Sequence, residues 1–416
     1  MALEISLKTA NAVIDAVTAF IARESGLDIT RTQHILRQPF RFFVNTWISR
    51  GCELQEIRCS KEYAFSTHDD ASRGEFIEVL KWVKSCTKLI CAFLSGRRIF
   101  CIGARDKQWV AEFYRGQAAR VDFHGGPEFL VHRSRDLRLK LQGHLVYFGF
   151  TERDAHALAT SFPENLLEGC MFKIRFFGVI IPTGEDRDVC SEDLIENISS
   201  SCFVAVALEK GWKFTYKEHA VPMLIFRDHF SWDYAKIAAQ IVLTENYLDF
   251  IGDEEIRKKC IYWPKKRVCH FLYDPQGPKL LCLPFIARAP WWGVAEWGND
   301  INFVDSNTHE VRALVDRISS REHILLRHHP AQKKGSRVHS LHPQSFAGEA
   351  ISEVVFVGWT QGLFECLNNR VPAQIVLPRQ FMSLTESGRE YVQLLEQKSL
   401  VKFPNASASE SYQNPV

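Results

Sequence analysis

Two loops in the second half of the chain could together bind the phosphate of a nucleotide. The apolar run 324–326 predicts a strand, and Arg327, His329 and Pro330 follow at its carboxyl end. A second predicted strand at 354–357 leads through Gly358-Trp359-Thr360-Gln361-Gly362 into a predicted helix. Free amide groups and the helix dipole favour an anion at a helix start, so we expect a phosphate there.

A carboxylate on the same predicted helix extends this site toward a nucleoside. Glu365 lies in the first turns, where it could accept hydrogen bonds from ribose hydroxyls. Either loop alone is typical of a strand stop or a capping turn, and the order and spacing of the two loops favour a nucleotide site. The expected nucleotide-binding residues are Arg327, His329, Pro330, Thr360, Gln361, Gly362 and Glu365.

Three carboxylates of the expected first domain are candidates for the catalytic group, in the order Asp228, Asp233, Glu152. Asp228 directly follows an apolar run, whereas Asp233 could instead serve a helix start. Glu152 follows a predicted strand at 145–150, and a helix cap is its alternative role. Such a group would act as a general base, or as a nucleophile in a retaining reaction.

Metal-binding patterns are weak throughout. Asp186 and Asp188 form an Asp-x-Asp pair, but four residues separate the pair from the preceding predicted strand, so we interpret it as an acidic loop. The 12 cysteines include no Cys-x-x-Cys pair and several lie in apolar runs, which predicts reduced, buried thiols and no zinc site. We expect neither a metal nor a cofactor.

The elements that must position these residues alternate between strand and helix. Residues 1–90 are predicted to be helical, and the strands that follow are predicted at 98–104, 119–123, 145–150 and 172–181. Helices are predicted at 105–115 and 231–250. In the second half the predicted strands are 279–286, 322–327, 354–357 and 373–377, and the predicted helices are 306–318, 361–369 and 385–397.

This alternation predicts an α/β protein with two Rossmann-like domains that face each other across a cleft, preceded by extra N-terminal helices. We place the first domain at 1–260 and the nucleotide-binding domain at 261–385. A terminal helix and a disordered tail occupy 386–416. The cleft between the domains is the expected site.

Composition and charge restrict the class of partner. The 416 residues carry 51 Lys and Arg against 49 Asp and Glu, so the basic excess typical of a nucleic-acid binder is missing. No run approaches the ~18 apolar residues of a membrane span. Charged residues interrupt the N-terminal region where a signal peptide would have its apolar core. We expect a cytoplasmic protein, with peripheral association at the inner face of the plasma membrane left open.

The Arg-His-His-Pro loop and the Thr-Gln-Gly-Leu-Phe-Glu helix start, in this order within residues 279–380, resemble bacterial capsule-polysaccharide glycosyltransferases. The resemblance is nearest to the β-Kdo (3-deoxy-manno-octulosonic acid) transferases, which use CMP-Kdo and have the two-domain GT-B fold. It implies that His329 and Pro330 match the family's His-Pro pair. It also implies that Thr360 and Gly362 match the phosphate-binding turn, and Glu365 the ribose carboxylate.

The implied partners are a nucleotide sugar and a glycan or glycolipid acceptor. The resemblance further implies a metal-independent transfer to a surface polysaccharide or lipopolysaccharide. Two alternatives stay open: a sialyltransferase-like or other enzyme with a UDP or CDP donor, and a non-catalytic component of a polysaccharide assembly complex. The sequence does not choose between an inverting and a retaining outcome.

Overall fold

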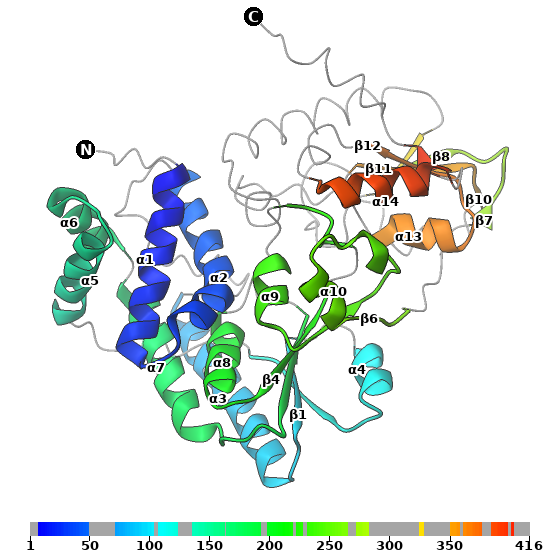
Figure 1. The fold of residues 1–416 in the computed structure, drawn as a ribbon. Helices are drawn as coiled ribbons and strands as arrows, with labels where there is room; N and C mark the ends of the chain where they lie inside the picture. Colours follow the sequence, from blue (N-terminus) through cyan, green and yellow to red (C-terminus); the bar gives the residue numbers. More distant parts are fainter. Residues whose placement is uncertain are drawn as a thin grey trace, which may run out of the picture. The chain divides into compact units, whose positions relative to one another are not determined.

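The computed structural model describes residues 7–49, 71–103, 107–123, 135–162, 164–192, 198–218, 222–227, 231–264, 272–282, 324–327, 350–357, 361–376, 384–397 and 401–402 (Figure 1). The chain divides into two compact units. The first comprises Met1–Lys217 and Phe230–Val242, and the second comprises Glu218–His229 and Leu243–Val416. Residues 243–260, which we expected in the first domain, belong to the second unit.

The first unit begins with the expected helices, α1 (Leu7–Ser25), α2 (Ile29–Ser49) and α3 (Ala71–Leu94). Helix α1 buries the apolar stripe that contains Val13, Val17 and Phe20. It packs against α2 and, further along the chain, against α5 (Arg135–Tyr147) and α7 (Glu164–Ile180). The N-terminal helices are therefore part of the core of this unit.

A parallel sheet follows, with strand order β2-β1-β3-β4-β5-β6. The pairs β1–β2, β1–β3, β3–β4 and β4–β5 are parallel. Its strands are β1 (Ile99–Ile102), β2 (Ala118–Val121), β3 (Asp188–Ser191), β4 (Lys213–Lys217), β5 (Gln240–Leu243) and β6 (Cys260–Tyr262). The predictions of β1 and β2 are confirmed.

Helices pack around these strands. The remaining ones are α4 (Lys107–Phe113), α6 (Glu152–Ser161), α8 (Ile198–Glu209) and α9 (Ser231–Ile237). Every residue of α8 from Ile198 to Leu208 is buried, because the helix contacts α7, α2 and β4. A helix that is apolar all round is typical of such a central position.

Two predicted strands are wrong, because residues 145–150 and 172–181 are largely helical. Residues 145–147 end α5, in which Leu137, Leu141 and Leu145 are buried at intervals of four. Residues 172–180 end α7, whose buried residues extend back to Leu166 with helical spacing. A short apolar window does not distinguish a strand from the end of a buried helix.

The long helix predicted at 231–250 is also wrong. Helix α9 ends at Ile237, strand β5 follows, and residues Leu248–Phe250 form the short 3₁₀ helix η2. Ile241, Val242 and Leu243 are all buried. A consecutive apolar run of this kind is typical of a strand covered on both faces of a parallel sheet.

The second unit contains a parallel sheet of order β13-β12-β11-β8-β9. Its strands are β8 (Lys279–Cys282), β9 (Ile324–Arg327), β11 (Glu353–Val357), β12 (Ala373–Val376) and β13 (Val401–Lys402). β7 (Leu272–Tyr273) pairs with β10 (Ala350–Ile351). The helices are α10 (Glu254–Lys259), α13 (Gln361–Asn368) and α14 (Glu386–Gln397).

The predicted strands β8, β9, β11 and β12 and the predicted helices α13 and α14 are confirmed. The helix predicted at 306–318 and the tail lie outside the described residues. Every cysteine in the described part of the chain is a free thiol. Among the described helices, none has the length and apolar character of a membrane span. Together these elements make an α/β protein with two parallel sheets.

Candidate functional site

The order of strands in the second sheet reverses at β8, which has β9 on one side and β11 on the other. All strands of this sheet run parallel, so their carboxyl ends lie at one edge. Ligands of open parallel sheets bind outside that edge at the point of reversal. The carboxyl ends of β8 and β11 are therefore the expected ligand position in this unit.

The described nucleotide-site candidates lie along this edge. Arg327 is the last residue of β9, and Gln361 begins α13 shortly after β11 ends. β8 separates these strands, so two strand spacings, about 10 Å, lie between β9 and β11. The structure thus brings Arg327 and the start of α13 to the same edge. His329, Pro330 and Thr360 lie outside the described residues.

Helix α13 packs closely on the strand before it. A Cβ atom added at Gly362 would lie 2.7 Å from the ring of Phe356, nearer than real Cβ contacts. Glycine at this position therefore has a packing role between helix and strand. Glu365 stands one turn later, half-buried on α13.

The first sheet has its own point of reversal at β1, between β2 and β3. Beside it, Glu192 follows β3 and Lys217 ends β4, and their side chains form a buried ion pair of 2.9 Å. The Lys217 ammonium group also lies 5.1 Å from the centre of the Trp109 ring. Two charges buried together require such pairing. Sequence reasoning missed this pair because β3 and β4 were not recognised.

Asp233, the second catalytic candidate, lies in the first turn of α9. The Tyr216 hydroxyl at the end of β4 is 2.7 Å from the Ser231 hydroxyl at the start of α9. This contact places the start of the helix at the carboxyl end of β4. Asp233 therefore lies at the edge of the first sheet where ligands of parallel sheets bind.

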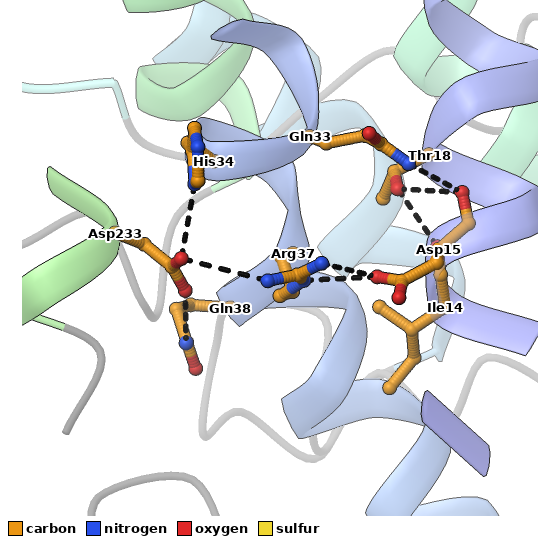
Figure 2. A network of polar contacts seen from close by, with 8 residues as sticks. All are labelled: Ile14, Asp15, Thr18, Gln33, His34, Arg37, Gln38 and Asp233. Atoms are coloured by element: carbon orange, nitrogen blue, oxygen red, sulfur yellow. Dashed lines mark hydrogen bonds and ion pairs between the residues drawn. The ribbon is translucent and has the colours of Figure 1, made fainter. Parts of the chain in front are cut away.

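The carboxylate of Asp233 is held by side chains of α2 (Figure 2). His34 Nδ1 lies 3.0 Å from Oδ1, and Gln38 Nε2 donates to Oδ2 at 3.2 Å. Arg37 Nη1 lies 3.5 Å from Oδ1. A carboxylate on Nδ1 favours the tautomer with its proton on that nitrogen, which makes Nε2 the basic atom of the ring.

Arg37 connects this carboxylate to a second one on α1. Its Nη2 and Nε lie 2.7 and 2.9 Å from Asp15 Oδ1. Gln33 Nε2 donates to the Asp15 carbonyl oxygen at 2.9 Å. Figure 2 shows the result, a continuous polar network that joins α1, α2 and α9. Because α2 lies far from Asp233 in sequence, no local pattern could have predicted these partners.

The other catalytic candidates receive less support. Glu152 is the exposed first residue of α6, and it follows helix α5 instead of the expected strand. Thr151 caps this helix by accepting a hydrogen bond from the Asp154 backbone N–H, as the alternative interpretation predicted. Asp228 lies outside the described residues.

The Asp-x-Asp pair occupies the opposite end of the first sheet. Asp186 is exposed, as expected for a loop, and forms an ion pair with Arg98. Asp188, however, begins β3 and bonds to the hydroxyl groups of Thr215 and Tyr114. Burial raises the pKa of this carboxyl to about 6. Over the described ranges, no three His, Cys, Asp or Glu residues form a cluster that could hold a metal ion.

A fully buried carboxyl, Glu218, lies in the second unit. It accepts hydrogen bonds from the Tyr247 hydroxyl and, at 2.5 Å, from the Met223 backbone N–H. Burial raises the pKa of Glu218 to about 8. The carboxyl is therefore mainly protonated at neutral pH, and sequence reasoning gave no sign of it.

Comparison of the chain with protein-family models, with curated proteins and with solved structures gives no match.

Proposed function

We propose that this chain is a glycosyltransferase that moves a sugar from a nucleotide-linked donor, specifically Kdo from CMP-Kdo, to a surface polysaccharide or lipopolysaccharide. The observation that carries the proposal is the carboxyl edge of the second sheet. Arg327 and the start of α13, with Glu365, flank the strand at which the order reverses. This is the position at which open parallel sheets bind nucleotides.

In the proposed GT-B arrangement, the second unit binds the donor and the first unit binds the acceptor. Arg327, His329 and the N–H groups at the start of α13 would face the phosphate of CMP. Glu365 would accept hydrogen bonds from the ribose hydroxyls. When the bond between the sugar and the phosphate breaks, negative charge grows on the phosphate, and these donors stabilise it.

The acceptor hydroxyl needs a group that takes its proton as the glycosidic bond forms. We assign this role to the Asp233–His34 pair. Nε2 of His34 would receive the proton, and the carboxylate of Asp233 would hold the ring and stabilise the charged imidazolium. The network would then contain two cations, His34 and Arg37, and two carboxylates, Asp233 and Asp15, so its charges would balance.

Binding of CMP, measured by isothermal titration calorimetry in the presence of EDTA, tests the donor site. We expect wild-type protein to bind CMP, and Glu365→Gln and Arg327→Met each to weaken binding about 10–100-fold, because each removes a hydrogen bond to a charged group. Glu390→Gln, an exposed substitution on α14, is the matched control and should leave the affinity unchanged.

Calorimetry with other nucleotides, together with an assay of CMP-Kdo turnover, separates the alternatives. If the protein binds UDP or CDP more tightly than CMP, the proposed site would stand, and the donor would be a UDP- or CDP-linked sugar. Nucleotide binding without turnover of CMP-Kdo would favour the non-catalytic component. If no cytidine or uridine nucleotide binds, or if the Glu365 and Arg327 variants bind as the wild type does, the proposed site is wrong.

A further inference from the structure

Helix α3 presents large apolar side chains to solvent along one face. Leu80, Val83, Ile90 and Leu94 are 50, 47, 39 and 83% exposed. Their spacings of three, seven and four residues place them on one stripe of a helix. The residues that α3 packs into the first unit lie on a different face and include Trp82, Cys86 and Leu89. The exposed stripe is therefore additional to the core-facing one.

Lysines accompany this stripe. Lys84 and Lys88 are exposed and lie on the face next to it, one and two turns from Leu80. Residues 79–105 contain six Lys and Arg and no Asp or Glu, although the whole chain has a net charge of only +2. Helix α3 as a whole has four basic residues and two acidic ones, Glu75 and Glu78, and both acidic residues precede Leu80. The part of α3 that carries the stripe, from Leu80 to Leu94, therefore has three lysines and no Asp or Glu.

We propose that α3 docks the protein onto an anionic membrane surface. An interfacial helix places apolar side chains among the acyl chains while flanking lysines contact anionic headgroups, and α3 offers both features. A second copy of the chain is the less suitable occupant, because pairing two such faces would bring like charges together. Peripheral association with a membrane, which the sequence leaves open, would then take place through α3 and would require anionic lipid.

Co-sedimentation with sucrose-loaded vesicles tests the proposal without nucleotide or acceptor, so it does not depend on the glycosyltransferase assignment. We expect the protein to sediment with vesicles of phosphatidylglycerol and phosphatidylcholine at low salt. It should remain in the supernatant with pure phosphatidylcholine, and 1 M salt should release it because salt screens the lysines. Figure 1 shows α3 as the light-blue helix that carries the residues to be changed.

Two double variants and a matched control locate the contact. Leu80→Gln with Leu94→Gln, and separately Lys84→Glu with Lys88→Glu, should each lower the vesicle partition coefficient at least 10-fold. Leu139→Gln with Tyr147→Gln removes two comparably exposed apolar side chains from α5 and should leave binding unchanged. Far-ultraviolet circular dichroism of each variant checks that the helices are retained.

A probe on Cys91, an exposed thiol of α3, keeps the test decisive if a variant misfolds. An environment-sensitive fluorophore should shift to shorter wavelength with anionic vesicles, and the Cys91→Ser protein should lack that signal. Equal binding by wild type and both α3 variants, or no spectral shift, overturns the proposal. So does a concentration-dependent dimer in analytical ultracentrifugation that the Leu80 and Leu94 substitutions dissociate, because the stripe would then join two copies.

Discussion

Asp233 is fixed by residues 199 and 195 positions earlier in the chain, His34 and Gln38. Both carboxylate oxygens of Asp233 thus contact side chains of α2, while the His34 ring is partly exposed to solvent. The orientation of the ring follows from these contacts. A fixed carboxylate that orients an imidazole is the usual way to keep one ring nitrogen available as a base.

If this pair activates the acceptor, Asp233→Asn should lower the rate of sugar transfer about 100-fold or more. The affinity for CMP, which we assign to the second unit, should not change. Asp15→Asn is the matched control, because it breaks the neighbouring contact to Arg37 but leaves Asp233 and His34 together. Rates are measured by release of CMP from the donor. Equal rate losses in both variants would indicate a structural role for the whole network.

The buried carboxyl of Glu218 makes stability depend on pH. The unfolded chain loses this proton above about pH 4.5, whereas the folded protein keeps it up to about pH 8. The contribution of Glu218 to stability is therefore complete below pH 4.5, declines as the pH rises, and is lost above about pH 8.

Glu218→Gln cannot ionise, so its free energy of unfolding relative to the wild type should increase steadily from pH 5 to pH 8. The slope should approach about 1.4 kcal/mol per pH unit at most. Urea denaturation at several pH values measures this difference in the free energy of unfolding. The control is Glu255→Gln, an exposed substitution, whose difference from the wild type should not change with pH. A flat difference for Glu218→Gln would show that the carboxyl is ionised in the folded state.

At the scale of elements, α14 touches the backbone of a distant segment. A Cβ atom at Gly388 would lie 2.5 Å from the Ile225 carbonyl oxygen, and the Thr385 N–H donates to that same oxygen at 2.8 Å. Gly388→Ala must therefore displace backbone, at a cost of about 1–3 kcal/mol. Gly178 of α7 is a helical glycine with open space at its Cβ position.

Hydrogen exchange measured by mass spectrometry reports the two helices separately. Gly388→Ala should speed exchange in α14. Gly178→Ala should leave α7 unchanged or protect it further by about 0.5–1 kcal/mol. Unaltered exchange in α14 would mean that the helix can move away from Ile225 without loss.

Sequence patterns predicted elements well where a strand and the following helix are separated by polar turns, as in β1 with α4 and β11 with α13. They failed where a short apolar run fits both a strand and a buried helix, since residues 172–180 are helical and residues 240–243 form a strand, each the reverse of the prediction. For the site, the pattern could identify Asp233 as a carboxylate at a helix start. It could not supply His34 or Gln38, because only tertiary packing brings α2 to α9.

At the scale of the molecule, the path of the chain differs from the simple succession expected from the sequence. Residues Glu218–His229 belong to the second unit although Phe230–Val242 return to the first. Within the second unit, Phe226 forms a bridge with Leu384, and Tyr247 bonds to Glu218. The two compact units are therefore discontinuous in sequence.

This discontinuity has a consequence for biosynthesis. Ile225 meets its partner Thr385 only after 160 further residues have been added, which takes roughly 8–32 s at ordinary ribosomal speeds. Leu224, Ile225 and Phe226 are buried in the folded protein. During that interval α9 and β5 have been synthesised, but α14, which contacts Ile225, has not. Nascent chains stalled between residues 260 and 380 should accordingly be the ones that chaperones hold most tightly.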